Sequence, residues 1–281
     1  VADAWWCSLA EKAGHDPLLF TSYVNESNLS DEWFEATKLL PEEERLAMVM
    51  NQPRPPSGLI YSEWTANHVI DDFKYRPEMT GRIAVDWAFR KPSVLIMVYD
   101  EEREATIIVH EINPQECTID ELARMILLIA WPRSLMARAP GPRIWLDSGV
   151  ADKAGAARND QTGRSAFRAM KKLPHEGGIG VPLKFTTDPV MTNVLNGIQK
   201  VKRAIAQRKY LCTREVWNRG EKAIGNSFRK AILSYGWTPT KDEPKKDGRE
   251  DPLDALRYDC IFHYWSEMSL PTITPRKALG R

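Results

Sequence analysis

Three apolar runs follow one another between residues 82 and 112, and each is rich in β-branched side chains. The runs are RIAVDWA (82–88), SVLIMVYD (93–100) and ATIIVHEI (105–112), with charged or proline-containing turns between them. Runs of this length and composition are typical of β-strands. Strands joined by such short links pair in antiparallel order, so the pattern predicts a three-stranded antiparallel meander.

The segment after the meander changes to the spacing of a helix. Residues 118–130 are TIDELARMILLIA, in which Thr118 and Glu121 form a capping-box signature ahead of apolar residues at helical spacing. A turn, RAPGP, then leads into RIWLD (143–147), which predicts a short strand that ends at Asp147. A helical crossover of this kind places the second strand parallel to an earlier one.

The remaining elements complete an α/β pattern. Basic helices are expected at 188–207 and about 214–235, and candidate strands are LKFTT (183–187) and KYLCT (209–213). In the final helix, DPLDALRYDCIFHYW (251–265), Asp251 can cap, Pro252 suits the first helical position, and Asp254 follows in the first turn. This order predicts a mixed sheet with helices on its faces. Helices are also expected within residues 1–56, before a boundary near QPRPPSG (52–58).

Composition narrows the class of protein without naming a function. The chain has 281 residues, 43% of them hydrophobic, and no run of about 20 apolar residues that a membrane helix needs. The N-terminus lacks a signal-peptide pattern, so a soluble, cytosolic protein is expected. The four cysteines form no CxxC pair and are expected to be reduced core thiols. The sequence contains no GxxxxGK[ST] motif, which excludes P-loop ATP chemistry in this chain.

Charge is distributed unevenly along the chain, although the formal net charge is only +1. Residues 1–80 carry 6 Lys and Arg against 14 Asp and Glu, a net of −8, whereas residues 148–232 carry 17 against 6, a net of +11. The second segment is suited to a polyanion such as nucleic acid. A solvated helical face is the alternative reading of the same charges.

Three aspartates occur at the ends of elements that this fold brings together. A carboxylate inside an apolar strand, such as Asp86, is costly to bury unless it is paired or bound to a cation. If RIWLD lies parallel to RIAVDWA, then Asp86 and Asp147 meet at neighbouring carboxyl ends, and Asp254 is the third candidate. Clustered carboxylates favour hard cations such as Mg²⁺ or Mn²⁺, and one pair of such ions can hydrolyse a phosphodiester.

Each of these acids also has an ordinary structural explanation. Asp86 could pair with Arg82 or Arg90, Asp147 could start a turn, and Asp254 is favoured by the helix dipole whatever its function. The joint pattern of three acids in this order favours a common site. Weaker candidates for the same site are Asp152, Asp160 and Asp259.

Two basic groups are candidates for contact with DNA. The first lies in a glycine-containing segment after the RIWLD strand and comprises Arg158, Arg164, Arg168, Lys171 and Lys172. The alternative group, for which a solvated helix face is an equal explanation, comprises Lys200, Lys202, Arg203, Arg208 and Lys209.

Three segments resemble a known family. IAVDWAF, IWLDSG and EPKKDGREDPLDALRY are similar to the nuclease domain of the large subunit of tailed-bacteriophage DNA-packaging terminases, over about residues 80–265. The resemblance implies an RNase H-like fold, with Asp86, Asp147 and Asp254 as catalytic, metal-binding residues and one or two Mg²⁺ or Mn²⁺ ions. EDPLD stands where many relatives place a histidine, which leaves Asp251 as a cap, a ligand or a residue that supports a ligand.

The resemblance also implies a domain organisation. Residues 1–78, with YVNESNL and GLIYSEW, resemble the end of the terminase ATPase domain and its linker, so truncation would explain the missing P-loop. The RNase H-like nuclease domain is expected at 79–270 and a flexible tail at 271–281.

The function expected from this resemblance is a metal-dependent endodeoxyribonuclease that cuts concatemeric viral DNA during packaging. Its partners would be double-stranded DNA and, in the full-length motor, the small terminase subunit and the portal protein, with no membrane involved. Its location would be the host cytoplasm, transiently at the procapsid. The alternatives are another RNase H-like phosphoryl transferase, such as a resolvase or transposase core, and a noncatalytic DNA-docking module.

Overall fold

The structure is a computed structural model that describes most of the chain. The described residues are 21–41, 45–46, 49–50, 58–87, 91–141, 143–157, 165–238, 243–246, 248 and 250–268. None of the helices in these ranges combines the length and the apolar character that a bilayer-crossing segment needs. The expected tail at 271–281 lies outside the described residues.

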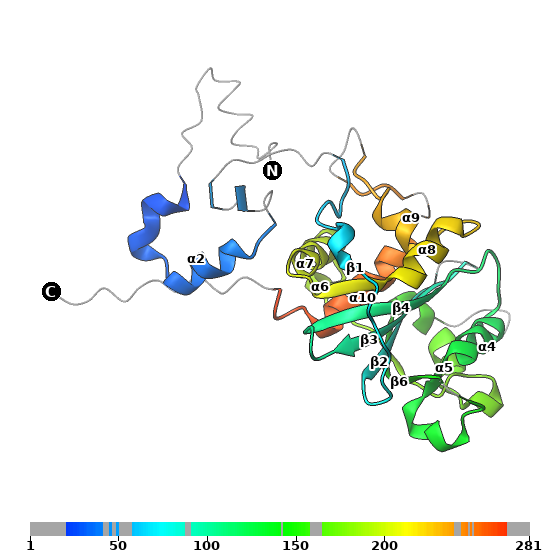
Figure 1. The fold of residues 1–281 in the computed structure, drawn as a ribbon. Coiled ribbons are helices and arrows are strands. Elements are labelled where there is room, and N and C mark those ends of the chain that lie inside the picture. The colour runs from blue at the N-terminus through cyan, green and yellow to red at the C-terminus, as the bar shows by residue number, and fades with distance from the viewer. Residues whose placement is uncertain are drawn as a thin grey trace.

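The predicted meander forms the middle of one eight-stranded sheet (Figure 1). Its strands are β2 (Thr80–Asp86), β3 (Ser93–Asp100) and β4 (Ala105–Ile112), and both pairs are antiparallel. The central strand β3 buries Val, Ile, Leu and Met side chains on both faces, because helices cover the sheet on each side. The prediction from the three apolar runs is confirmed.

The other strands extend the meander on both edges in parallel pairings. β6 lies beside β2, and β8 lies beside β4, in the order β1-β8-β4-β3-β2-β6-β5, with β7 also paired to β6. The added strands are β1 (Val69–Ile70), β5 (Ala130–Pro132), β6 (Ile144–Ala151), β7 (Leu183–Lys184) and β8 (Tyr210–Thr213). The sheet is therefore mixed, as the element order predicts.

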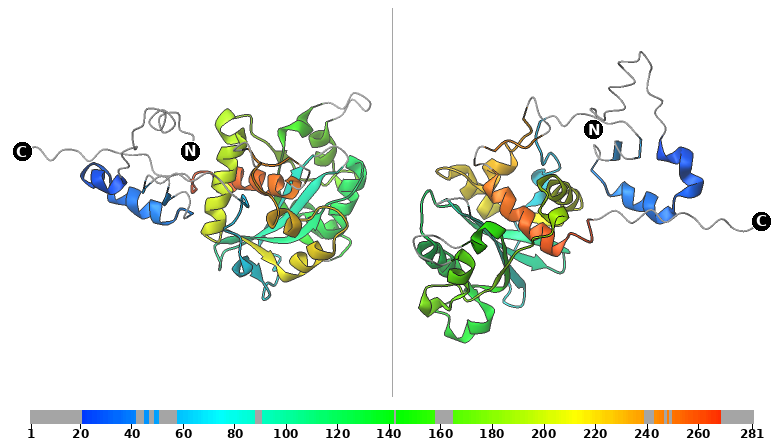
Figure 2. Two further views of the ribbon diagram at one scale, coloured as in Figure 1. Left: turned by 90° about the horizontal axis from the view of Figure 1, so that it is seen from above. Right: turned by 180° about the vertical axis from the view of Figure 1, so that it is seen from behind.

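One face of the sheet carries the later helices of the chain (Figure 2). Their apolar side chains share one core with alternate residues of the central strands, including Ala84, Leu95 and Met97. One helix of this layer, α10, crosses the sheet and packs on β2, β3 and β6. The helices of this layer are α6 (Pro189–Thr192), α7 (Val194–Ala206), α8 (Arg214–Lys222), α9 (Phe228–Ile232) and α10 (Asp251–His263).

The opposite face of the sheet is covered by α4 (Ile119–Ile129) and α5 (Ala166–Lys171). The Thr118 side chain accepts the Glu121 N–H, and the Glu121 carboxylate accepts the Thr118 N–H, so the predicted capping box is present. Short 3₁₀ turns connect the elements of the fold: η2 (Ala66–His68), η3 (Arg133–Arg138), η4 (Lys153–Ala156) and η5 (Pro174–Glu176).

The N-terminal part of the described chain has a small cluster of its own. Trp33 of α2 (Asp31–Lys38) packs with Leu29 and Val49, the Ser30 side chain caps α2, and η1 (Ser22–Asn28) precedes them. Ile60, Tyr61 and Trp64, by contrast, pack in the core beneath α7 and α10. A domain boundary at residue 79 stays a prediction, and the packing of Ile60 to Trp64 favours the earlier break, before Gly58.

Strand β6 is longer than its sequence predicts. The apolar run ends at Asp147 and a Ser-Gly pair follows, yet the strand continues to Ala151. A Cβ on Gly149 would lie 2.3 Å from the Leu183 side chain and 2.8 Å from that of Ile83, so β7 and β2 close in around this position. Here glycine marks close approach of neighbouring strands rather than a turn.

Replacing Gly149 with valine will therefore destabilise the fold. The added side chain overlaps buried neighbours on β2 and β7, and overpacking of this kind costs about 1–3 kcal/mol. Chemical denaturation should show a lower unfolding midpoint for Gly149→Val than for Ser148→Ala, the control at the neighbouring position. Equal midpoints for the two variants would contradict the tight packing at Gly149.

Candidate metal-dependent nuclease site

Alternate residues of β2 face helix α10. Side chains of a strand alternate between its faces, so Arg82, Ala84 and Asp86 project to the same side of the sheet. Ala84 belongs to the core that contains the α10 residues, whereas Ile83 and Val85 pack on the opposite face. The burial of Asp86, which is 8% exposed, therefore follows from its place on the face that α10 covers.

A buried ion pair connects the middle of α10 to the start of β2. The Arg82 Nε lies 3.4 Å from the Asp259 Oδ1, and both residues are inaccessible to solvent or nearly so. The Tyr210 hydroxyl donates to the other Asp259 oxygen at 2.8 Å, and an Arg82 amino group donates to Thr106. The weaker candidate Asp259 is therefore a structural acid, paired with a residue of another element.

The carboxyl end of β2 faces the first turn of α10. The charges of Asp254, Asp251 and Asp152 all act on Asp86, and together with burial they raise the pKa of Asp86 to about 8. Burial is the largest cause, and the Asp254 charge is the second. Asp254 and Asp152 thus lie close enough to Asp86 for their charges to act on it, and their role as a common metal site stays a prediction.

Asp152 lies beside Asp86 because it directly follows β6. Val85 pairs with Ala151 in the parallel ladder, and the Asp152 N–H donates to the Val85 carbonyl at 3.1 Å. The Trp87 indole N–H donates to the Asp152 carbonyl, also at 3.1 Å. Asp86 and Asp152 thus end neighbouring parallel strands, which is the arrangement that the sequence predicts for Asp86 and Asp147.

The predicted position of Asp147 is wrong. Asp147 lies beside Gly81, whose N–H donates to it at 2.8 Å, and the Arg133 guanidinium holds it at 3.0 Å. Gly81 is five residues before Asp86, a separation of roughly 16 Å along a strand. The two carboxylates are thus too far apart to share a cation. The error follows from the expected end of the strand, because β6 continues for four residues beyond Asp147.

Asp254 is paired with a cation of its own helix. The Arg257 Nε donates to the Asp254 Oδ1 at 3.1 Å, and an Arg257 amino group lies 2.9 Å from the same oxygen. Burial raises the pKa of Asp254, and the Arg257 charge lowers it. The Arg257 stem packs on Gly197 of α7, where a Cβ would lie 2.5 Å from the Arg257 Cδ. Its guanidinium carbon lies 4.9 Å from the centre of the Tyr258 ring.

Asp251 has a different local role from the expected one. Glu250 is the N-cap residue of α10, so Asp251 is the first residue of the helix rather than its cap. Burial raises the pKa of Asp251 to about 6, with further contributions from the charges of Glu250 and Asp254. Asp251 therefore adds negative charge at the edge of the acidic group formed by Asp86, Asp152 and Asp254.

Comparison with known proteins identifies the fold. The structure is similar to the large terminase of a thermophilic bacteriophage, with a TM-score of 0.62 and 16% identity over 92% of this chain. It is also similar to the nuclease domain of the P22 large terminase, with a TM-score of 0.52 and 13% identity over 75% of this chain and 95% of that domain. The chain has the fold of a terminase large-subunit nuclease domain. The predicted RNase H-like α/β architecture is thereby confirmed.

Comparison of the sequence alone finds no match. No protein-family model matches it. No curated protein matches it either. The chain spans 58% of the length of the thermophilic-phage large terminase.

The acidic group of this terminase-like fold has donors suited to a hard cation. All its side chains are carboxylates, and burial together with their mutual repulsion raises the pKa of Asp86 to about 8. A divalent cation held by these carboxylates would relieve that repulsion and displace the proton. Within the described residues, no three His, Cys, Asp or Glu side chains are already arranged as a metal-ligand set. The acidic group therefore suits a hard cation by the chemistry of its donor atoms, while the Asp254 carboxylate is held by Arg257.

Part of the first basic group lies on α5, on the face of the sheet opposite α10, and α5 contacts the residue that follows β2. Arg168 and Lys171 are exposed on α5, and Lys172 follows the helix. Phe167 of α5 packs edge-on against Trp87, with ring centres 6.0 Å apart, and Trp87 directly follows Asp86. Arg158 and Arg164 lie outside the described residues. The described members of this group remain candidates for DNA contact.

The alternative basic group is occupied by protein contacts. Lys202 lies 3.4 Å from Glu63, Arg203 donates to the Met268 carbonyl at 2.6 Å, and Lys209 lies 2.7 Å from Glu267. Lys202 and Arg203 are also buried. These side chains attach α7 and the turn after it to neighbouring segments, so they are not a solvated face.

Asp86→Asn will change how stability depends on pH. Asp86 ionises near pH 4 in the unfolded chain and near pH 8 in the folded one, so folding binds a proton between these values. Its contribution to the free energy of unfolding therefore falls as pH rises from about 4 to about 8. Asparagine keeps the shape without the charge.

The effect can be measured by thermal denaturation in EDTA. The difference in melting temperature between Asp86→Asn and the wild type should increase from pH 5 to pH 8 in favour of the variant. The corresponding change in the difference of their free energies of unfolding is a few kcal/mol at most. Asp188→Asn, at an exposed helix cap, is the matched control. A difference between Asp86→Asn and wild type that is constant over this pH range would contradict the raised pKa.

Proposed function

We propose that this chain is a divalent-metal-dependent endodeoxyribonuclease that cuts viral DNA during genome packaging. The observation that carries the proposal is the meeting of Asp86, Asp152 and Asp254 at the carboxyl ends of β2 and β6 and the first turn of α10. Clefts of α/β sheets form at such strand ends. The terminase nuclease fold adds support, because it is the architecture of the P22 nuclease domain.

The chemistry assigned to the site is hydrolysis of a phosphodiester bond. Asp86, Asp152 and Asp254 would hold one or two Mg²⁺ or Mn²⁺ ions. When bound, a pair of such ions supplies the charge that activates a water molecule and stabilises the leaving oxygen. Trp87 fixes the Asp152 main chain, and Arg257 fixes the Asp254 carboxylate. No His or Ser nucleophile is required for this reaction.

Substrate binding is assigned to the positive segment beside the acids. Helix α5 packs against Trp87, which directly follows Asp86, and its residues Arg168 and Lys171, with Lys172 after it, would contact backbone phosphates of the bound DNA. Phosphate contacts position DNA without reading its sequence. Among the described residues, no helix is recognised as a base-reading element. Cleavage is therefore proposed to be largely independent of sequence.

The chain is proposed to be the C-terminal part of a terminase large subunit. In that arrangement residues 1–78 would belong to the end of the ATPase domain and its linker. The complete protein would act on double-stranded DNA in the host cytoplasm, with the small subunit and the portal as partners at the procapsid.

Single substitutions of the three acids test this proposal. Asp86→Ala, Asp152→Ala and Asp254→Ala should each reduce Mg²⁺- or Mn²⁺-dependent nicking of plasmid DNA by at least about 100-fold, because each removes a ligand of the ions that stabilise the transition state. Asp147→Ala is the matched control, since its carboxylate contacts Arg133 instead. Plasmid nicking with each ion and with EDTA gives the measurement, and circular dichroism checks the fold.

Three results would contradict the assignment. Full activity of Asp152→Ala with loss of activity in a folded Asp147→Ala would restore the expected role of Asp147. DNA binding by the wild type without any divalent-dependent cleavage would support a docking module. Preference for branched DNA or joining of DNA ends would favour a resolvase or a transposase core.

The double variant Arg168→Gln/Lys171→Gln tests the proposed DNA surface. Each phosphate contact contributes about 0.9 to the slope of log K against log salt concentration, so losing two lowers the slope by about 2. Fluorescence anisotropy with a duplex over a salt series measures this slope. Lys222→Gln, an exposed lysine on α8, should leave it unchanged. An unaltered slope in the double variant would remove α5 from the DNA-binding surface.

A further inference from the structure

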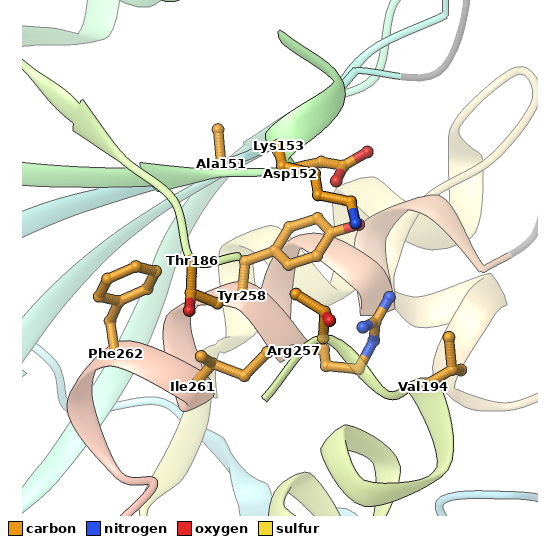
Figure 3. A pocket seen from close by; sticks show the side chains of 10 residues that line it. Ala151, Asp152, Lys153, Thr186, Val194, Arg257, Tyr258, Ile261 and Phe262 are labelled. Carbon is orange, nitrogen blue, oxygen red and sulfur yellow. The ribbon is translucent and has the colours of Figure 1, made fainter. Parts of the chain in front are cut away.

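A pocket of about 220 Å³ adjoins the acidic site (Figure 3). Asp152 and Arg257 line it, and the same two residues belong to or contact the acidic group. The pocket is therefore next to the position proposed for the scissile phosphate. Its remaining walls come from the segment after β7, the start of α7 and helix α10.

The pocket is lined by both apolar and charged side chains. Val194, Ile261 and Phe262 form apolar walls. Lys153, Arg257 and the Tyr258 hydroxyl add positive and polar groups, as Figure 3 shows with Lys153 and Tyr258 on the side of Asp152. Lys153 is exposed and, within the described residues, forms no ion pair with a carboxylate. An apolar surface beside cations is suited to a ligand that has both a flat apolar part and an anionic part.

Helix α10 explains why this pocket and the acids are neighbours. Asp254, Tyr258 and Ile261 are spaced by four and three residues, so they lie along one stripe of the helix. The Arg257 guanidinium, held by Asp254, contacts the Tyr258 ring and fixes its orientation. The same helix thus presents a proposed metal ligand and, one turn later, an aromatic ring.

We propose that this pocket holds one unpaired nucleotide of the DNA strand that is cut. The inference rests on the proposed nuclease function and specifies its substrate. The pocket is smaller than the roughly 300–1,000 Å³ typical of sites for drug-sized ligands, which suits a single nucleobase and not a base pair. The base would pack on Tyr258 and the apolar wall, while Lys153 would contact the adjoining phosphate.

A nucleotide can enter such a pocket only after it leaves the stack. Extrusion from a duplex costs free energy, and the cost is least where the base is already unpaired. Stacking of the base on an aromatic side chain offsets part of this cost. The proposal therefore predicts tighter binding to DNA that contains a single unpaired nucleotide than to a fully paired duplex.

Binding in EDTA tests the pocket separately from catalysis. Two duplexes are compared by anisotropy, one fully paired and one with a single bulged 2-aminopurine, whose fluorescence reports stacking. The wild type should bind the bulged duplex about tenfold more tightly and quench its fluorescence. Val194→Phe fills the pocket and should bind both duplexes equally, with no quenching.

Control variants keep the test decisive. Leu128→Phe places the same ring at a 70% exposed position of α4 and should retain the wild-type preference. If Val194→Phe fails to fold, Lys153→Gln at an exposed position replaces it, with an expected loss of part of the bulge preference. Equal affinity of the wild type for both duplexes, with no quenching, would overturn the inference.

A parallel cleavage assay separates this inference from the proposed function. Divalent-dependent cleavage by a wild type that lacks bulge preference would overturn the pocket assignment and leave the nuclease intact. Bulge preference and quenching without any divalent-dependent cleavage would support the pocket as a nucleotide site and overturn the nuclease function.

Discussion

The packing of α10 across β2 is the contact on which the site depends. The two elements run in opposite directions, with Asp259 over Arg82 and Asp254 over Asp86. Removing one partner of a buried ion pair leaves an uncompensated charge, at a cost of about 3–5 kcal/mol. The Arg82–Asp259 pair therefore penalises any sliding of the helix along the strand. The same restriction determines where Asp254 lies relative to Asp86.

The acidic group is costly to the isolated protein. Burial and three neighbouring carboxylates raise the pKa of Asp86 to about 8, and burial raises that of Asp251 to about 6. Arg257 reduces this repulsion at Asp254, and its own position is fixed by contact with Gly197. The fold leaves the negative charge of the acidic group unbalanced, next to a positively charged segment of the chain. This imbalance is the physical basis for assigning cation and DNA binding to this part of the molecule.

Much of the fold could be predicted because local patterns agreed with packing. The three β-branched runs and the capping box at Thr118 can be read from short stretches of sequence. The two basic helices predicted at 188–207 and about 214–235 are each divided in the structure, into α6 and α7 and into α8 and α9. The extent of β6 could not be predicted, because the fit of Gly149 between Ile83 and Leu183 depends on strands distant in the sequence. Ser-Gly resembles a turn until those neighbours are known.

The candidate site shows the same division. Asp86 and Asp254 can be predicted from their places in a strand and a helix. The sequence predicts Asp147 instead of Asp152, because the strand is expected to end at Asp147 rather than at Ala151. The apolar pair Val150 and Ala151 before Asp152 is the available signal, since it continues the strand pattern. The buried roles of Lys202 and Arg203 have no local signal, because their partners are Glu63 and Met268.

A crystal structure of the chain soaked in Mn²⁺, with anomalous diffraction recorded, tests the central claim most directly. The account predicts an anomalous peak in contact with the Asp86 carboxylate and with at least one of Asp152 and Asp254. A peak at Asp147, or the absence of any peak near Asp86 at saturating Mn²⁺, would contradict it.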